Sequence, residues 1–441
     1  MSNKIVIKKK IESFKKKIEV DGDKSLSIRW ILFSSLASGV SKAKNLLMSD
    51  DVLAAIETVK KLGIKVKFNR NICEIYGKGI RGYSYKKNLI LNAKNSGTLG
   101  RLVLGLLIDT TFPIKLIGDK SLSKRDFKRV SDPLSKFGAK FKLNKGRYLP
   151  LTINGSKKLK PIYYSEKKGS AQCKSAVIFG GLKTKNTTII KAKKSRNHTE
   201  LLCKYLNLPV KVIRKKEYDL IKINQMKKIK KLNYNIPSDI SSSAFFLVLT
   251  ALNENCKLII KNVNINPSRI GVVTILRKMG IKIKFQNQKI YKGEKKADIK
   301  IVSPKSIKPI NCPPSLNSRA IDEFLLIFLV AAKANGTSYF KDLAELNQKE
   351  SPRLVWGEKI LNKIGIKTIT TNNSIKIFGN PNLNLKKKVI IKNFLKDHRV
   401  FMTSVVAALS FGGDWNIYDK DSINSSFPNF LKIITKLRKN V

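Results

Sequence analysis

The sequence predicts an α/β protein built from repeated small subdomains. Four segments carry apolar residues at helical spacing, reach a Gly and continue with alternating apolar and polar residues: Val59–Val66, Leu134–Phe141, Leu276–Ile283 and Leu361–Thr368. Gly suits the left-handed residue just past a helix end, and Lys in the last turn faces the negative end of the helix dipole. Each segment therefore indicates a helix, a glycine stop and a strand.

Two weaker copies of this pattern bring the number to six. They are Leu202–Asn207, with Asn207 in the role of Gly, and Ile433–Leu437. The copies lie too far apart for a solenoid, whose period is roughly 20 to 50 residues. Six copies suit two pseudo-symmetric domains of three subdomains each, with helices packed inward against surrounding sheets. Ordinary alternation of helix and strand in one sheet would give the same periodicity, so the pattern leaves both arrangements open.

Length and charge set further bounds. The chain has 441 residues, which suits two to four domains at roughly 100 to 200 residues each. Lys and Arg number 89 against 30 Asp and Glu, a net charge of +59. Lys is spread along the whole chain among Ile and Asn, so we interpret the charge as a composition bias on solvated faces. A basic nucleic-acid-binding protein is the alternative, because it would explain the charge directly.

The cysteines and apolar runs indicate the compartment. Five cysteines are scattered without a C-x-x-C pair or a His-rich partner segment, which argues for a reducing compartment and against structural zinc. The Lys-rich start has no apolar segment typical of a signal peptide, and the apolar runs are too short to span a membrane. We therefore expect a soluble, cytoplasmic protein with no membrane partner and no metal.

An internal echo predicts two anion-binding turns. Gly22–Arg29 recurs as Gly118–Arg125 with one mismatch, and both copies precede helical patterns. Backbone amides at a helix start bind anions, and Lys and Arg add charge-assisted hydrogen bonds to phosphate or carboxylate. Two copies of such a turn favour an anion site over a charged helix cap.

Small polar residues also precede apolar helices at Asn95–Thr98, Gly169–Gln172 and Ser238–Ser243. A helix cap needs only one such residue, so these runs, taken with the two echoed turns, favour ligand binding.

Gly77–Gly82 matches G-x-G-x-x-G, but the following residues continue as a strand, whereas a dinucleotide fingerprint must open a helix. We predict a hairpin turn there.

Acidic residues are scarce and cluster at three expected helix starts: Ile321–Glu323, Lys349–Arg353 and Asp397–Arg399. Acidic groups at a helix start also stabilise the helix dipole. Glu350, however, stands between Lys349 and Arg353, which suits a general acid/base beside an anionic substrate. Arg399 could bind a carboxylate through two hydrogen bonds.

These motifs, in this order, resemble the 5-enolpyruvylshikimate-3-phosphate (EPSP) synthase family, the 3-phosphoshikimate 1-carboxyvinyltransferases. The resemblance runs from Gly22–Arg29 to Ser426–Pro428, almost the entire chain. It implies an α/β fold of two pseudo-symmetric domains, each of three βαβαββ units with helices inside (an inside-out α/β barrel), and an active site in the interdomain cleft. It places residues 1–20 and 238–441 in one domain and residues 21–237 in the other.

The resemblance also implies the reaction. The family transfers the enolpyruvyl group of phosphoenolpyruvate to the 5-hydroxyl of shikimate 3-phosphate by addition and elimination, releasing phosphate on the pathway to chorismate and aromatic amino acids. It implies no cofactor, no metal and no nucleic-acid partner, and we expect a monomer. Asp322 would take the 5-hydroxyl proton, Glu350 would protonate the methylene group and later remove a proton, and Lys24 would complete the catalytic set.

The binding residues follow from the same matches. Those for shikimate 3-phosphate would be Lys24, Ser25, Arg29, Ser170, Gln172, Arg196, Asp322 and Lys349. Those for phosphoenolpyruvate would be Lys24, Gly97, Arg125, Arg353 and Arg399. The sister family that uses UDP-N-acetylglucosamine is a further alternative, but it has a Lys-Asn pair at the position of Lys24-Ser25 and usually a reactive loop Cys, which this chain lacks.

Overall fold

The computed structural model describes residues 3–438 and divides into two compact units. Unit 1 comprises Met1–Asp21, Pro237–Ile290 and Lys295–Val441, and unit 2 comprises Gly22–Ile236 and Tyr291–Glu294. The predicted boundaries differ by one residue at two places, since Asp21 and Pro237 belong to unit 1. The short segment Tyr291–Glu294, which groups with unit 2, was not anticipated.

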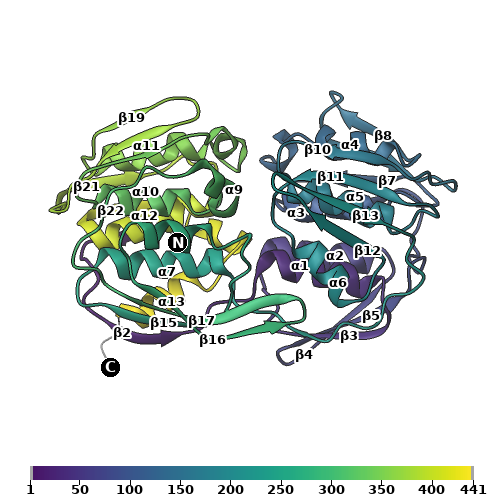
Figure 1. The fold of residues 1–441 in the computed structure, drawn as a ribbon, viewed down its shortest axis with the longest axis horizontal. Coiled ribbons are helices and arrows are strands. Elements are labelled where there is room, and N and C mark those ends of the chain that lie inside the picture. Colours follow the sequence, from purple (N-terminus) through teal and green to yellow (C-terminus); the bar gives the residue numbers. More distant parts are fainter. Residues whose placement is uncertain (1–2, 439–441) are drawn as a thin grey trace. The chain divides into compact units, whose positions relative to one another are not determined.

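Unit 2 contains three four-stranded sheets (Figure 1). The first runs in the order β14 (Tyr234–Asn235), β3 (Ser38–Lys44), β5 (Ile72–Lys78) and β4 (Lys65–Asn69). The second runs β6 (Leu89–Asn92), β7 (Ile114–Ile117), β9 (Tyr148–Asn154) and β8 (Lys140–Asn144). The third runs β10 (Tyr163–Glu166), β11 (Thr188–Lys193), β13 (Tyr218–Ile223) and β12 (Val210–Arg214). The helices are α1 (Lys24–Ser35), α2 (Asp50–Lys61), α3 (Gly97–Leu106), α4 (Lys128–Ser135), α5 (Ala171–Gly181) and α6 (His198–Tyr205), with the short 3-10 helix η1 (Leu122–Lys124).

Unit 1 repeats this plan with one four-stranded and two three-stranded sheets. They run β16 (Ile283–Tyr291), β17 (Glu294–Val302), β15 (Lys257–Asn264), β2 (Lys15–Ile18); β18 (Thr337–Phe340), β20 (Ile375–Phe378), β19 (Thr368–Thr370); and β1 (Lys4–Ile7), β22 (Gly412–Tyr418), β21 (Leu385–Ile391). The helices are α7 (Ile240–Leu252), α8 (Gly271–Lys278), α9 (Asn317–Ala320), α10 (Phe324–Ala332), α11 (Arg353–Lys363), α12 (His398–Phe411) and α13 (Phe430–Arg438), with 3-10 turns η2 (Pro314–Leu316), η3 (Ala344–Gln348) and η4 (Lys420–Ser425).

The repeat has the order βαβαββ. It is complete in β6-α3-β7-α4-β8-β9 and again in β10-α5-β11-α6-β12-β13, where the first two strands are parallel and the last two are antiparallel. The predicted α/β class is therefore confirmed, and so is its repetition. None of the six sheets closes on itself in the part of the chain that the structure describes.

Three fully buried helices occupy the interior of unit 1. Every residue of α7, α10 and α12 is buried, and Figure 1 shows these three helices at the centre of unit 1 with strands around them. A helix that is apolar on all sides must be covered on all sides. The helices therefore pack inward, as the sequence predicts, and the sheets cover them.

The predicted glycine stops are confirmed. Gly63, Gly138, Gly280 and Gly365 all have positive φ angles between 81° and 112°, and Asn207 takes φ 54° in the same role. Because a Cβ atom disfavours this conformation, Gly, and next Asn, serves best after a helix end.

One local prediction was wrong. Gly77 and Lys78 end strand β5, and residues 79–82 form a turn closed by a hydrogen bond from the Gly82 amide to the Gly79 carbonyl at 3.1 Å, but this turn forms no hairpin. The strand before it, β5, and the strand after it, β6, belong to different sheets. The second echoed turn, Gly118–Arg125, contains the three-residue 3-10 helix η1 and is followed by α4, so it precedes a helix as the sequence predicts.

Within residues 3–438, no helix has the length and apolar character needed to cross a lipid bilayer.

Candidate functional site

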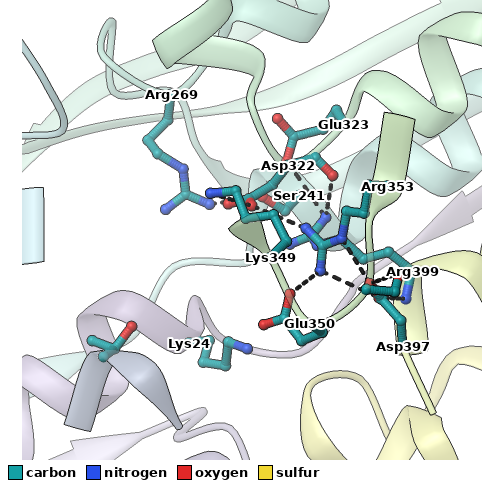
Figure 2. Close-up of polar contacts among 12 residues, drawn as sticks. Lys24, Ser241, Arg269, Asp322, Glu323, Lys349, Glu350, Arg353, Asp397 and Arg399 are labelled. Carbon is teal, nitrogen blue, oxygen red and sulfur yellow. Dashed lines mark hydrogen bonds and ion pairs between the residues drawn. The ribbon is translucent and has the colours of Figure 1, made fainter. Parts of the chain in front are cut away.

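In unit 1, three helix starts bring charged side chains together around Arg353 (Figure 2). Arg353 is the first residue of α11, Asp397 caps the start of α12, and Asp322 lies just before α10. Asp397 caps its helix by accepting a hydrogen bond from the Arg399 amide at 2.9 Å. The three helix starts that the sequence singled out are thus neighbours in the fold.

Arg353 is 2% exposed and binds three carboxylates. Its Nε donates to Asp397 Oδ2 at 2.9 Å, its Nη2 to Asp397 Oδ1 at 3.2 Å and also to Glu350, and its Nη1 to Asp322 Oδ1 at 3.4 Å. Burial alone would lower the pKa of Arg353, but Asp397 and Glu350 outweigh it and raise that pKa. The guanidinium is therefore held as a cation in a fixed orientation.

Further charged groups surround this centre. Lys349 Nζ lies 3.9 Å from Asp322 Oδ1. Arg399 donates from Nη1 to the Asp322 carbonyl at 2.8 Å, and the same nitrogen lies 3.7 Å from the buried carboxylate of Glu323. All five unit 1 residues that the sequence predicted for the site, namely Asp322, Lys349, Glu350, Arg353 and Arg399, therefore form one cluster, which we call the Arg353 cluster.

A second buried pair lies at the start of α7. Asp239 caps that helix, and Arg269 Nη2 donates to Asp239 Oδ1 at 3.2 Å and to Ser241 Oγ at 2.8 Å. Sequence reasoning singled out the polar turn Ser238–Ser243 but did not place Arg269 in a site. Asp397 and Glu323 were quoted only as parts of motifs, although each contacts a predicted substrate-binding arginine.

In unit 2, α1 carries Lys24, Ser25 and Arg29. Asp23 caps the helix by accepting from the Leu26 amide at 2.9 Å, so the echoed turn includes an ordinary cap. Lys24 Nζ lies 2.8 Å from Asp51 Oδ2. Arg29 is buried, and it donates to Thr199 Oγ1 at 2.8 Å and to the Ser25 carbonyl at 3.0 Å.

The starts of α3 and α5 form a second cluster in unit 2. Ser170 caps α5 by accepting from the Cys173 amide at 3.2 Å. Gln172 accepts from Arg101 Nη1 at 2.8 Å, and its amide donates to Thr98 Oγ1 at 3.1 Å. Burial lowers the pKa of Arg101 to about 10. Sequence reasoning missed Arg101 as a site residue, although it follows the Asn95–Thr98 turn by one helical turn.

Gly97 leaves space for two guanidinium groups. A Cβ atom built on Gly97 would lie 2.8 Å from Arg101 Nη1 and 3.2 Å from Arg125 Nη1. Arg125 also donates from Nη2 to Asn95 Oδ1 at 3.3 Å. Gly97, Arg125 and Gln172 are therefore neighbours, whereas Arg196 lies in the loop between β11 and α6 and is partly exposed.

The chemistry of these clusters is electrostatic. Among the described residues, no group of three or more His, Cys, Asp or Glu side chains is arranged to hold a metal ion. Fixed guanidinium and ammonium groups suit phosphate and carboxylate ligands, and carboxylates beside them suit proton transfer. Fold and site together define an α/β protein of two repeated units, each equipped with cations for anionic ligands.

Comparison with known proteins gives the family. The model of the EPSP synthase (3-phosphoshikimate 1-carboxyvinyltransferase) family matches residues 8–434. The 3-phosphoshikimate 1-carboxyvinyltransferases of Caldicellulosiruptor bescii and Ruthia magnifica are 37% and 38% identical, covering 100% and 96% of this chain and 100% and 95% of their own lengths. The chain belongs to the EPSP synthase family.

Solved structures agree with this assignment. EPSP synthase from Acinetobacter baumannii superposes with a TM-score of 0.86 at 32% identity, covering 98% of this chain and 97% of that one. The enolpyruvyl transferase NikO from Streptomyces tendae has a TM-score of 0.76 over 99% of this chain and 98% of its own, but at 13% identity it supports the fold alone.

Proposed function

We propose that this chain transfers the enolpyruvyl group of phosphoenolpyruvate to the 5-hydroxyl of shikimate 3-phosphate and releases phosphate. The observation that carries the proposal is the position of Arg353, whose guanidinium contacts both Asp322 and Glu350. Two carboxylates bound to one buried cation supply an acid and a base next to a group that binds anions.

The two carboxylates have different surroundings. Asp322 lies near Lys349 as well as Arg353, and Arg399 binds its carbonyl, whereas Glu350 is bonded to Arg353 Nη2. In the addition step, Asp322 takes the proton of the 5-hydroxyl while the hydroxyl oxygen bonds to C2 of phosphoenolpyruvate. Glu350, in its protonated form, gives a proton to C3. In the elimination step, Glu350 takes a proton back from C3 as the C2–O bond to phosphate breaks, and Asp322 gives up the hydroxyl proton to the departing phosphate or to water.

Arg353 retains capacity for a substrate. A guanidinium has five N–H groups, and the hydrogen bonds to Asp397, Glu350 and Asp322 occupy four of them. One N–H of Nη1, next to Asp322, is left for the carboxylate or phosphate of phosphoenolpyruvate. We assign Arg399 and, from unit 2, Lys24, Gly97 and Arg125 to the same substrate.

We assign the remaining predicted residues to shikimate 3-phosphate, namely Lys24, Ser25, Arg29, Ser170, Gln172, Arg196, Asp322 and Lys349. The contacts of Arg29 with Thr199 and the Ser25 carbonyl fix its direction, which supports a role in orientation. The proposal needs no metal, organic cofactor or nucleic acid, and one chain suffices. We further propose that the protein works in the cytoplasm, where its five free cysteines would stay reduced.

The test is phosphate release from phosphoenolpyruvate, with shikimate 3-phosphate or UDP-N-acetylglucosamine as acceptor, for wild type and Asp322→Asn. We expect release with shikimate 3-phosphate alone, and a loss of roughly 10²- to 10⁴-fold in kcat for Asp322→Asn, the usual contribution of a general base. Release only with the nucleotide sugar would indicate the sister activity. No release from a folded sample with either acceptor would reject the proposal, and salt-sensitive nucleic-acid binding would then be measured.

A further inference from the structure

A polar cavity of about 360 Å³ lies at the sheet of β15, β16 and β17 in unit 1, apart from the Arg353 cluster. Its polar lining consists of Lys261, Asn262, Asn287, Lys289, Lys296 and Asp298. No sequence motif pointed to this place. The volume falls within the usual range of small-molecule pockets, roughly 300 to 1,000 Å³.

A β-bulge builds one wall of this cavity. The register of β15 against β17 shifts between Ile260 and Val263, and Asn262 within the shift takes φ 56°. The Asn262 amide donates to Asp298 Oδ1 at 2.8 Å. Bulges re-aim side chains and are frequent next to functional sites, and this one turns Asn262 toward the neighbouring strand.

The single carboxylate of the lining is already neutralised. Asp298 accepts from the Asn262 amide, from Asn287 Nδ2 at 2.8 Å and from Lys261. These donors together lower the pKa of Asp298, although burial alone would raise it. Asp298 is therefore held in its ionised form, with Lys261 as its ion-pair partner.

Two further ammonium groups, those of Lys289 and Lys296, belong to the same lining. Lys296 is only 8% exposed and donates to Asn262 Oδ1 at 2.7 Å. Burial lowers the pKa of Lys296 and the nearby Lys289 lowers it further, against the opposing attraction of Asp298 and Glu19. Lys289 is exposed, and its ammonium group makes no hydrogen bond or ion pair with the residues between 3 and 438. An anion between Lys289 and Lys296 would relieve their mutual repulsion.

We propose that this cavity binds a small phosphate monoester that also carries a hydroxyl group. The phosphate would accept hydrogen bonds from Lys289 and Lys296, which charge-assisted bonding favours. The hydroxyl would donate to the remaining acceptor capacity of Asp298 or of Asn262 Oδ1. This inference does not rest on the proposed function, because none of the lining residues belongs to the Arg353 cluster or to the predicted substrate sites.

The bulge also connects the cavity to both segments at the unit boundary. Ser238 donates its amide to the Asn262 carbonyl and accepts from the Asn264 amide, each at 2.9 Å, and its hydroxyl donates to the Val20 carbonyl at 2.9 Å. Val20 and Ser238 stand next to the residues at which unit 1 ends, Asp21 and Pro237. An occupied cavity should therefore stiffen these two segments.

The test uses glycerol 3-phosphate as the probe and measures its affinity by titration calorimetry on the full chain. Lys289→Glu should weaken binding by at least roughly tenfold, equal to about 1.4 kcal/mol. Lys284→Glu is the matched control, because Lys284 is an exposed residue of the same strand outside the cavity and its replacement changes the net charge equally. Lys296→Gln, which keeps a hydrogen-bond donor, tests the buried cation separately.

The outcomes separate this site from the substrate site. Lys349→Met removes a cation of the Arg353 cluster. This variant should bind glycerol 3-phosphate as tightly as wild type does, in contrast to Lys289→Glu. Equal weakening by Lys289→Glu and Lys284→Glu would show a general charge effect and overturn the proposal. Binding that is lost in Lys349→Met but kept in Lys289→Glu would also overturn it. Since no turnover is measured, failure of the proposed function would not affect the result.

Discussion

Arg353 and Asp397 are separated by 44 positions in the sequence and form a buried, two-point ion pair in unit 1. Asp397 is 0% exposed, and Ser351 Oγ donates to the same carboxylate at 2.9 Å. A bidentate pair fixes the plane of a guanidinium as well as its position. This pair therefore sets the direction in which Arg353 Nη1 faces Asp322.

The first prediction concerns the stability of this pair. Removing one partner of a buried ion pair leaves an uncompensated charge and typically costs about 3 to 5 kcal/mol. We expect Asp397→Ala to lower the free energy of unfolding by an amount of this order, measured by urea denaturation. The neighbouring pair of Lys396 and Asp421 is exposed at both side chains, so Lys396→Met should cost less than about 1 kcal/mol. Similar losses in the two variants would contradict the assigned role of Asp397.

The second prediction concerns acid. Burial alone would raise the pKa of Asp397, but Arg353 reverses this and holds it below the ordinary value of 3.8. A carboxyl group with a lowered pKa stabilises the fold above its unfolded pKa, and this contribution is lost as the pH falls through the folded-state pKa. Wild type should therefore lose stability steeply below about pH 3.8, whereas Asp397→Asn should lose less over the same range. Urea midpoints at several pH values check this, and parallel curves for the two proteins would disprove it.

How far the sequence could predict the structure depended on the range of the interactions. Gly63 and Asn207 lie in left-handed conformations because a helix end imposes this locally, and the sequence predicted both. Gly77–Gly82 was taken for a hairpin because a turn between strands looks the same whether or not the strands pair. Only the sheet order separates β5 from β6. A local sequence pattern could not predict which distant strands pair with each other.

The tip of the hairpin between β16 and β17 illustrates the same limit. Within unit 2, Glu294 is buried and its Oε1 lies 2.6 Å from His198 Nδ1. Lys292 Nζ lies between 5.5 and 5.9 Å from the ring centroids of Tyr205, Tyr234 and Tyr291. The contacts with His198, Tyr205 and Tyr234 join residues that are far apart in the sequence, so no local spacing marked Tyr291–Glu294 as part of that unit.

The sequence could predict most of the charged residues of the candidate site, but not the contacts that these residues make with one another. The sequence marked Glu350 and Arg353 because they stand three residues apart. It marked Asp397 only as a member of a charged helix start, since its contact with Arg353 depends on how α11 and α12 pack. Arg101 was missed because one Arg in an apolar helix gives no signal until Gln172 is found beside it.

The third prediction concerns the cysteines. All five are free and buried, and burial raises the pKa of Cys73 to about 12 and that of Cys312 to about 11. Because the thiolate is the reactive form, native protein should react slowly with a thiol reagent such as dithionitrobenzoate. In unfolded protein, all five thiols should be exposed and should react quickly with the same reagent. A thiol that reacts rapidly in the native state would contradict the burial of these residues and would renew interest in the sister activity.

The fourth prediction concerns Gly97 and rests on the proposed function. Ala at this position would bring a methyl group to 2.8 Å from Arg101 Nη1 and 3.2 Å from Arg125 Nη1, so at least one guanidinium must shift. Small displacements of positioned groups can cost roughly 10²-fold in rate. We expect Gly97→Ala to lower kcat/KM for phosphoenolpyruvate by roughly 10- to 100-fold, mainly through KM, because binding rather than proton transfer is disturbed. The unfolding midpoint should not fall, since Ala is favourable inside a helix. Unchanged kinetics would mean that Arg125 does not bind this substrate.

The fifth prediction separates the two carboxylates bound to Arg353. Glu350 is proposed to exchange protons with C3 of phosphoenolpyruvate, whereas Asp322 serves the 5-hydroxyl. In deuterated water with both substrates, wild type should incorporate deuterium at C3 whenever the adduct forms and reverts. Glu350→Gln should stop this incorporation and lower kcat by roughly 10²- to 10⁴-fold, because Gln keeps the shape but cannot transfer a proton.

Mass spectrometry of recovered phosphoenolpyruvate measures the label, and Glu345→Gln, in η3 of the same unit, serves as the control. Incorporation at the wild-type rate in Glu350→Gln would assign the C3 proton to another group, and Asp322, on the other side of Arg353, would be examined next in the same assay.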